Sequence, residues 1–483
     1  MEMRRIAGEG AYGGMEENTM AILDNSGFKH SHHLKDDRLA FLEAVRAASL
    51  LSGNGSAPTR KIFEAVFHIL KDVDSLDLIM ESYQLLIELH MVHFPRVFLS
   101  KEQSESSSSS PSNNLFKFIT VQEAWLPFNF GLDLSYNERT EANKPSRSSV
   151  DSLGFHSLIQ EVAKADKERK SEVLELMFLK TMLLLQYLVI FLEGDFLPRN
   201  CAFIAEELNW TFLRESLVNM LLGSRKILYK SLIKDCLSLM HVLSQEAMSF
   251  EDLSYHESSS IESSAEISTA VTLALPEVKK STCAALKKFL LMVMELDSSR
   301  WSADMQGLTT RADGVRTPVV EIILDELIYD NDIRCSFLQV FDEPKWKLKI
   351  IIQYFQKYIP KSSVQTRSSY VPVSDETFDG ILKYLANGNN TRSIIKKICT
   401  EVVQLLLAHA FQAYLVLHLQ CASDGCDVSP EDIKSISPVE ICNSIVSAFM
   451  CLKREDRSLE LICIGKEVLF TAATILSTKS HGL

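Results

Sequence analysis

Histidines are the residues of this sequence best suited to metal chemistry, yet their spacing does not make a site. His90 and His93 lie three residues apart on a predicted helix, which puts both imidazoles on one side. A metal site needs further ligands, and neither a third ligand nor a glutamate base follows this pair. The histidine-rich tract at 30–33 also has no acidic or cysteine ligand at fixed spacing. We interpret the pair as packed or capping histidines and the tract as a polar tail, and we predict no metal site.

The acidic run at 325–332 is the next candidate, and it lacks the glycine and the terminal glutamate of a calcium loop. We interpret it as an exposed helix edge and a turn. The sequence has no phosphate-binding glycine loop, dinucleotide fingerprint, H-E-x-x-H zinc motif or G-x-S-x-G nucleophile elbow. We therefore predict a protein that is not an enzyme, with no cofactor and no small-molecule substrate. An undetected enzyme is the alternative, and a deep polar pocket with converging titratable groups would be its sign.

A lysine-rich flank is the feature best suited to binding. Between Glu343 and Arg367 there are five lysines, one arginine and one glutamate, in a chain whose net charge is −13. An acidic chain is poorly suited to coating nucleic acid over its whole surface, so direct DNA binding is a rival interpretation and not the first one. A plain solvated flank of an amphipathic helix is the other. The candidate partner-binding residues are Lys345, Trp346, Lys347, Lys349 and Lys357.

The element that must position these lysines is a helix predicted from Glu343-Pro344 to Pro360. At about 100° per residue it has two apolar sides. One side carries Leu348, Ile351, Ile352, Phe355 and Ile359, and the other carries Trp346, Ile350 and Tyr354. A helix that is apolar on two sides must be covered on both, either inside a stacked helical array or by a partner. A preceding helix is predicted after Thr317 as cap and Pro318 as its first residue.

Composition indicates a long, folded, helical chain. Its 483 residues exceed the usual limit of a single core, about 250–300 residues. With 46% hydrophobic residues but only 18 glycines and 13 prolines, the chain favours long helices joined by few loops. The ten cysteines form no C-x-x-C pair, which suits a reducing compartment, and the N-terminus has no apolar signal segment. We predict an all-α fold, an irregular armadillo- or HEAT-like helical repeat array, without a fixed-period repeat.

The expected organisation alternates helical arrays with polar segments. Breaks in apolar periodicity and runs of Ser, Gly, Pro or acidic residues mark the boundaries. The predicted segments are a flexible tail at 1–35, an N-terminal helical array at 36–134 with a Ser-rich loop at 101–114, a linker at 135–150, middle helices at 151–250, an acidic Ser-rich loop at 251–275, and a C-terminal helical array at 276–483.

Two apolar stretches leave alternatives open. The segment Trp125–Gly131 (WLPFNFG) places three aromatic residues around a proline, so it cannot be a regular helix. We expect an irregular plug docked on neighbouring helices, and the alternative is an exposed recognition motif. The run 174–192 is the most hydrophobic in the chain, but charges bracket it and polar residues interrupt it. We expect a buried helix there and not a membrane span, which needs about 20 predominantly apolar residues.

Several ordered motifs carry a resemblance to a known family. The most specific are DGVRTP at 313–318, EIILDEL at 321–327 and FLQVFDEPKWKL at 337–348. Others are AYGG at 11–14, LEAVRAASL at 42–50, EAWLPFNFG at 123–131, DFLPRN at 195–200 and GKEVLFTA at 465–472. With these motifs the chain resembles the plant suppressor-of-NPR-inducible family, also called negative regulator of systemic acquired resistance. No single motif is chemical, and the resemblance spans nearly the whole chain.

That resemblance implies a function by binding. It implies a nuclear repressor of plant defence genes with an armadillo-like fold. It also implies a non-SMC element six-like subunit of the five/six-type structural maintenance of chromosomes (SMC) complex, paired with an element-five-like partner. Such a subunit would act in the DNA damage response and homologous recombination, with indirect chromatin or DNA association and no membrane. A transcriptional corepressor that acts independently of the SMC complex is the alternative.

Overall fold

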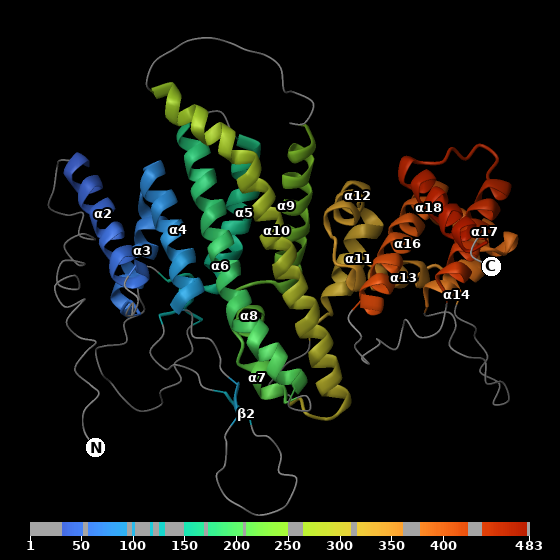
Figure 1. Cartoon of the computed structure of the whole chain (residues 1–483), viewed down its shortest axis with the longest axis horizontal. Coiled ribbons are helices and arrows are strands. Elements are labelled where there is room, and N and C mark those ends of the chain that lie inside the picture. Colours follow the sequence, from blue (N-terminus) through green and yellow to red (C-terminus); the bar gives the residue numbers. More distant parts are fainter. Residues whose placement is uncertain are drawn as a thin grey trace, which may run out of the picture. The chain divides into compact units, whose positions relative to one another are not determined.

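The computed structural model describes most of the chain. The described residues are 31–51, 57–93, 99–101, 116–118, 125–130, 149–168, 172–205, 209–249, 264–310, 316–360, 377–423 and 437–480. They are almost entirely helical, which confirms the predicted all-α helical array (Figure 1). The exception within the described residues is an antiparallel pair of three-residue strands, β1 (Leu99–Lys101) and β2 (Phe116–Phe118), on either side of the predicted Ser-rich loop. Lys101, the first residue of the predicted loop, lies in β1, and the remaining loop residues, 102–114, lie outside the described residues.

Two compact units divide the chain, with the boundary between Ile323 and Leu324. The sequence instead placed one C-terminal array from residue 276 onward. The helices of the first unit are α2 (Ser31–Arg46), the π-helix η1 (Ala47–Leu51), α3 (Arg60–Asp72), α4 (Leu76–His93), α5 (Ser152–Glu168), α6 (Glu172–Ala205), α7 (Trp210–Arg214), α8 (Leu217–Gly223), α9 (Tyr229–Ser249) and α10 (Ser264–Met305). The helix α11 (Val319–Tyr329) contains the boundary.

The core of the first unit forms around α6. This helix is apolar on all sides, and such a helix is stable in water only when neighbours surround it. It packs against α3, α4, α5, α7, α8 and α10, and its Tyr187, Leu188 and Leu192 are buried (Figure 1). By length and composition, Leu174–Ile204 and Thr400–Gln420 could each cross a membrane. Most of the apolar window in each is buried within the fold, which favours the interpretation as core helices.

The aromatic segment after residue 124 docks as an irregular plug, as predicted. Trp125 is buried, with its ring stacked on Phe63 at 5.9 Å and tilted against Phe67 at 5.2 Å. Phe128 is also buried and its ring lies 6.4 Å from that of Phe191 on α6. The backbone pairs with Val150, whose N–H donates to the Pro127 carbonyl at 2.7 Å. The segment thus joins α3 and α6, and the exposed-motif alternative is wrong for its two buried rings.

The carboxylate of Asp195 on α6 fixes the start of a second helix. One oxygen accepts a hydrogen bond from Arg199, one turn further along, at 2.8 Å. The other accepts the N–H of Leu217, the first residue of α8, at 2.7 Å. A negative charge at a helix N-terminus satisfies an otherwise unpaired N–H and interacts favourably with the helix dipole. The motif DFLPRN therefore has a structural use in this fold.

A carboxylate of α10, Asp297, fixes the start of α11 in the same way, through contacts at the end of the DGVRTP motif. Arg316 donates two hydrogen bonds to one oxygen of Asp297, at 2.9 and 2.7 Å, and its guanidinium lies over the Tyr229 ring. The other Asp297 oxygen accepts the N–H of Val319, the first residue of α11, at 2.7 Å. The helix begins one residue after the predicted Pro318, and its first N–H is satisfied by a carboxylate from another helix.

The second unit is built around α16. Its helices are α12 (Asn331–Val340), α13 (Pro344–Gln356), α14 (Phe378–Leu385), α15 (Gly388–Ile395), α16 (Thr400–Ser423), α17 (Pro438–Glu455) and α18 (Cys463–Ser480). The helix α16 packs against α13, α17 and α18, while α17 also covers α14 and α15. Ser437 caps α17 by accepting the Val439 N–H, with Pro438 as its first residue.

Two predicted segment boundaries differ from the structure. The helix α2 begins at Ser31, so the last five residues of the predicted flexible tail are helical, and Lys35 pairs with Asp77 on α4. The helix α10 begins at Ser264, so 264–275 is helical within the range predicted as an acidic loop. Pro276, the first residue of the predicted C-terminal array, lies inside α10. The remainder of the tail, the loop at 251–263 and most of the linker at 135–150 lie outside the described residues.

Candidate partner-binding surfaces

The helix that carries the predicted lysines is covered on both of its apolar sides. Trp346, Ile350 and Tyr354 are buried on one side. Leu348, Ile351 and Phe355 are buried on the other. The helices α16 and α14 both contact α13. The second unit itself therefore supplies the neighbouring helices that the two-sided apolar pattern of α13 requires. Coverage by a partner is not needed to explain the two-sided pattern.

Lys345 and Lys349 present the exposed part of the predicted site. Their ammonium groups lie 5.5 and 4.8 Å from the centre of the Trp346 ring, a cation–π arrangement. Trp346 itself is only 2% exposed. The tryptophan side chain therefore belongs to the core, and a role for Trp346 in partner binding stays a prediction. The two lysines mark a positive edge above it.

The other two predicted lysines are engaged in contacts within the second unit. Lys347 is half-buried and donates to the carbonyl of Leu338 in the last turn of α12, at 2.7 Å. A lysine in this position satisfies a carbonyl that the helix end leaves unpaired. The Lys357 ammonium lies 2.8 Å from Asp325 on α11. The five predicted residues thus do not converge on one surface, and a role in partner binding stays a prediction for Lys345 and Lys349.

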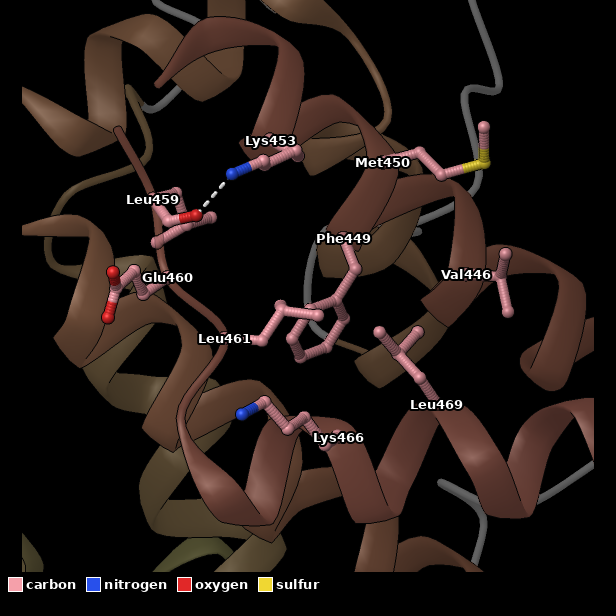
Figure 2. Close-up of a pocket in the computed structure, with 9 residues that line it drawn as sticks. All are labelled: Val446, Phe449, Met450, Lys453, Leu459, Glu460, Leu461, Lys466 and Leu469. Atoms are coloured by element: carbon pink, nitrogen blue, oxygen red, sulfur yellow. Dashed lines mark hydrogen bonds between the residues drawn. The ribbon is translucent and has the colours of Figure 1, made fainter. Parts of the chain in front are cut away.

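A groove between α17 and α18 is a second candidate, and the sequence analysis did not single it out. We call it the α17–α18 groove, and its volume is about 600 Å³. In Figure 2 the side chains of Phe449, Leu461 and Leu469 turn toward one another along its floor. It is lined by Val446, Phe449, Met450, Lys453, Leu459, Glu460, Leu461, Lys466 and Leu469. The available signal was α18 itself, whose residues Val468, Leu469, Phe470 and Ile475 are too widely spread for one apolar face.

The predicted histidine pair has packing roles. Burial lowers the pKa of His90 to about 4, and its ring lies 5.6 Å from that of Phe191. His93 lies within 3.1 Å of the Ser49 carbonyl through Nε2. In the described part of the chain, no group of three or more His, Cys, Asp and Glu side chains is placed to hold a metal ion. The tract at 30–33 has no described side chains.

The acidic run at 325–332 also serves local structure. Asp330 caps α12, because one of its oxygens accepts the N–H groups of Asp332 and Ile333, both at 2.9 Å. Asp325 makes the ion pair with Lys357. This is the exposed edge and turn that the sequence indicated.

A short imidazole–carboxylate contact links two helices of the first unit. His156 on α5 lies 2.7 Å from Asp235 on α9 through Nε2, and Gln160 donates to the same carboxylate oxygen at 2.9 Å. Such a pair could orient a proton acceptor, but no serine, threonine or cysteine is bonded to His156 in the described residues. Its geometry joins α5 to α9.

Comparison with known proteins assigns the family. Residues 96–343 match the family model of the SNI1 middle domain, and residues 359–480 match that of the SNI1 C-terminal domain. The chain is also similar to the negative regulator of systemic acquired resistance SNI1 of Arabidopsis thaliana. The two are 43% identical over 472 residues, which cover 97% of this chain and 96% of that protein. The chain belongs to the SNI1 family. No solved structure matches it.

The two candidate surfaces lie in different places relative to the segments that match the SNI1 domain models. The α17–α18 groove lies wholly inside the C-terminal domain match. The predicted lysines, 345 to 357, fall in the interval between the two matched segments. The middle domain match ends at Glu343, directly before α13, whereas the compact units divide within α11. In this member of the SNI1 family, α13 packs with the helices of the second unit.

Proposed function

We propose that this chain is a non-catalytic helical scaffold that negatively regulates systemic acquired resistance and defence gene expression in plants. The observation that carries the proposal is 43% identity, over almost the full length of both chains, with the Arabidopsis regulator. The aligned region covers 97% of this chain and is not confined to one isolated motif.

We further propose that the chain works in the nucleus as a subunit of the SMC five/six complex. Its direct partner there is a non-SMC element five-like protein, and the assembled complex acts in the DNA damage response and homologous recombination. The support is the resemblance of ordered motifs, from AYGG at 11–14 to GKEVLFTA at 465–472. The association with chromatin is indirect, because a chain of net charge −13 is a poor general ligand for the phosphate backbone.

The mechanism we propose is binding without a chemical step. In the described residues three buried or half-buried carboxylates join one helix to another. Asp297 holds the start of α11 to α10, Asp195 holds that of α8 to α6, and Asp235 links α5 to α9. Stacked helices leave long surfaces that can receive other proteins. Nucleotide hydrolysis and DNA handling then belong to the other subunits of the complex.

Complementation tests the regulatory function. Expression of the full chain in an Arabidopsis line that lacks SNI1 is expected to restore repression of defence transcripts in unchallenged leaves. The Asp297→Asn variant is a folding-impaired control and is expected to accumulate less and to restore less. Transcripts that stay high while the wild-type chain accumulates normally would overturn the proposal.

Co-purification discriminates the proposed complex from the independent corepressor. Under the proposal, SMC five/six subunits accompany the affinity-purified chain from nuclei. A corepressor that works alone would restore repression in the complementation experiment and bring none of these subunits with it. Nuclear and cytosolic fractions of the same plants measure the localisation, which is expected to be nuclear.

A further inference from the structure

The last helix of the structure is apolar on more sides than the second unit covers. On α18, Val468 and Ala472 are buried, whereas Phe470 is 76% exposed. On the neighbouring α17, Met450 is 69% exposed. For α13, the same two-sided apolar pattern predicted coverage that the fold supplies. For α18, the described helices of the second unit leave the large apolar side chain of Phe470 exposed, as they leave Met450 exposed on α17.

Met450 also lines the α17–α18 groove. Val446 and Met450 of α17 and Leu469 of α18 form its apolar walls, above a floor at Phe449 (Figure 2). The depression lies between two helices and their connecting segment, and its volume of about 600 Å³ lies in the range of pockets that bury a ligand. Grooves of this kind receive an amphipathic helix through apolar side chains spaced i, i+3 or i+4, and i+7.

The charges of the groove favour an acidic occupant. One lysine stands on each helix, Lys453 on α17 and Lys466 on α18. Lys453 is held in place because its ammonium donates to the carbonyls of Leu459 and Arg457. The third charged residue, Glu460, turns its carboxylate away from the apolar side chains in Figure 2. The groove therefore presents two positive groups beside its apolar floor, on a chain whose net charge is −13.

We propose that the α17–α18 groove binds an acidic amphipathic helix of a partner protein. The apolar face of that helix lies on Phe449, Leu461 and Leu469, and its carboxylates lie beside Lys453 and Lys466. This inference rests on the proposed function as a binding scaffold and names the chemistry of one partner element. Charge complementarity steers such an encounter and selects the register of the bound helix.

A second copy of this chain is a poorer occupant for the same reason. A two-fold interface places the same patch of each subunit against its counterpart. The rim lysines of one groove would then lie near those of the other, with no gain in opposite charge. Like charges placed together in a contact disfavour it. The charges that attract an acidic helix thus oppose self-association through this face.

Two designed peptides test the proposal with the full purified chain. Both have about 18 residues, long enough to form a helix, and leucines at the i, i+3, i+4 and i+7 spacing. One carries glutamate on the flanks of the leucine stripe, and its twin carries lysine there. In fluorescence anisotropy, the acidic peptide is expected to bind at least about tenfold more tightly than its twin. Met450→Glu adds a negative charge to the wall of the groove, and its repulsion of the acidic peptide is expected to weaken that binding by at least about tenfold.

The matched control is Leu419→Glu on α16, a change of the same kind at a side chain that is 69% exposed outside the groove. It should leave acidic-peptide binding unchanged. Lys466→Glu should remove the preference for the acidic peptide. No binding of the acidic peptide, equal binding of the twin, or an unchanged affinity in Met450→Glu would each overturn the proposal. Dimerisation of the chain that Met450→Glu abolishes would overturn it in favour of a second copy.

The failure of this inference is distinguishable from failure of the proposed function. The peptide assay uses only the purified chain, so a negative result removes the groove as a helix-binding site and does not touch defence regulation. Complementation of the Arabidopsis line measures regulation by the wild-type chain and does not depend on the groove assay.

Discussion

Asp195 and Asp297 make the same contact in the two longest described helices of the first unit, α6 and α10. Each carboxylate accepts, at 2.7 Å, the N–H of a residue 22 positions further along, which is the first residue of a later helix. The remaining oxygen of each meets an arginine, Arg199 or Arg316. A repeated device of this kind fits an irregular array, in which the geometry recurs although the sequence shows no fixed period.

Removal of the charge at Asp297 is expected to destabilise the first unit. The side chains of Asp297 and Arg316, which form an ion pair, are each only 12% exposed. Asp297→Asn therefore leaves a largely desolvated guanidinium without its counter-charge. We expect a loss of about 2–3 kcal/mol in the free energy of unfolding. Urea denaturation measures it. The comparison is Lys288→Gln, also on α10, which breaks the more exposed ion pair between Lys288 and Glu193 of α6. This change should cost only about 0–1 kcal/mol. Equal losses in the two variants would contradict the assignment.

Two adjacent residues of the aromatic plug, Trp125 and Leu126, differ sharply in burial, so their substitutions should differ sharply in their effect on stability. Trp125→Ala removes a buried ring packed on Phe63, Phe67 and Phe191. The cavity should cost about 3–5 kcal/mol. Leu126→Ala, at a side chain that is 45% exposed, should change the free energy of unfolding by less than about 0.5 kcal/mol. Thermal and urea unfolding of both variants check the difference, and a tolerated Trp125→Ala would show that the segment does not dock as described.

His409 should make the second unit sensitive to acid. Burial, with a smaller contribution from the positive charge of Lys347, lowers the pKa of His409 to about 4, below its ordinary value of 6.5. Between these values the unfolded chain binds a proton that the folded chain does not, so stability falls as the pH is lowered from 6.5 to 4. At about 1.4 kcal/mol per pH unit, His409 accounts for a loss of roughly 3 kcal/mol.

The His409→Leu variant isolates this effect. Its unfolding free energy should depend less steeply on pH between 6.5 and 4 than that of the wild type. Near pH 7 the two should be similar, since Nδ1 of His409 is buried and makes no hydrogen bond with described residues. Parallel pH profiles for the two proteins would show that His409 does not set the slope.

The lysines of α13 should divide into two classes. Charge reversal at Lys345 and Lys349 is expected to weaken association with partners or DNA and to leave folding intact, because both side chains are exposed. Lys347→Glu is expected to destabilise the fold instead, because its ammonium binds the Leu338 carbonyl at the end of α12. Pull-down and gel-shift assays measure association, and urea unfolding measures stability. Unchanged association after the double reversal would remove α13 as a contact surface.

Local periodicity carried most of the fold prediction. The two-sided apolar pattern of α13 required cover on both sides, and the hydrophobic run of α6 favoured a buried helix. Positions of helix starts were less accessible, because Ser31 and Ser264 begin helices without a proline or glycine to mark them. The cap of α11 could not be predicted, since its acceptor is Asp297 from another helix.

The candidate site shows more clearly what cannot be predicted from the sequence alone. Lysine content and spacing are visible in the sequence, but tertiary contacts decide that Lys347 and Lys357 are engaged and that Trp346 is buried. The α17–α18 groove arises where Leu461, before α18, approaches Phe449 on α17. That juxtaposition depends on how two helices and their connection pack, and no single stretch of sequence records it.

The central claim is that this chain regulates by joining other proteins and performs no reaction of its own. Quantitative mass spectrometry of the tagged full chain, purified from plant nuclei, tests it most directly. The account predicts SMC five/six subunits and an element-five-like partner in stable proportion to the chain. A nuclear chain that restores defence repression but is recovered without any of these subunits would contradict it.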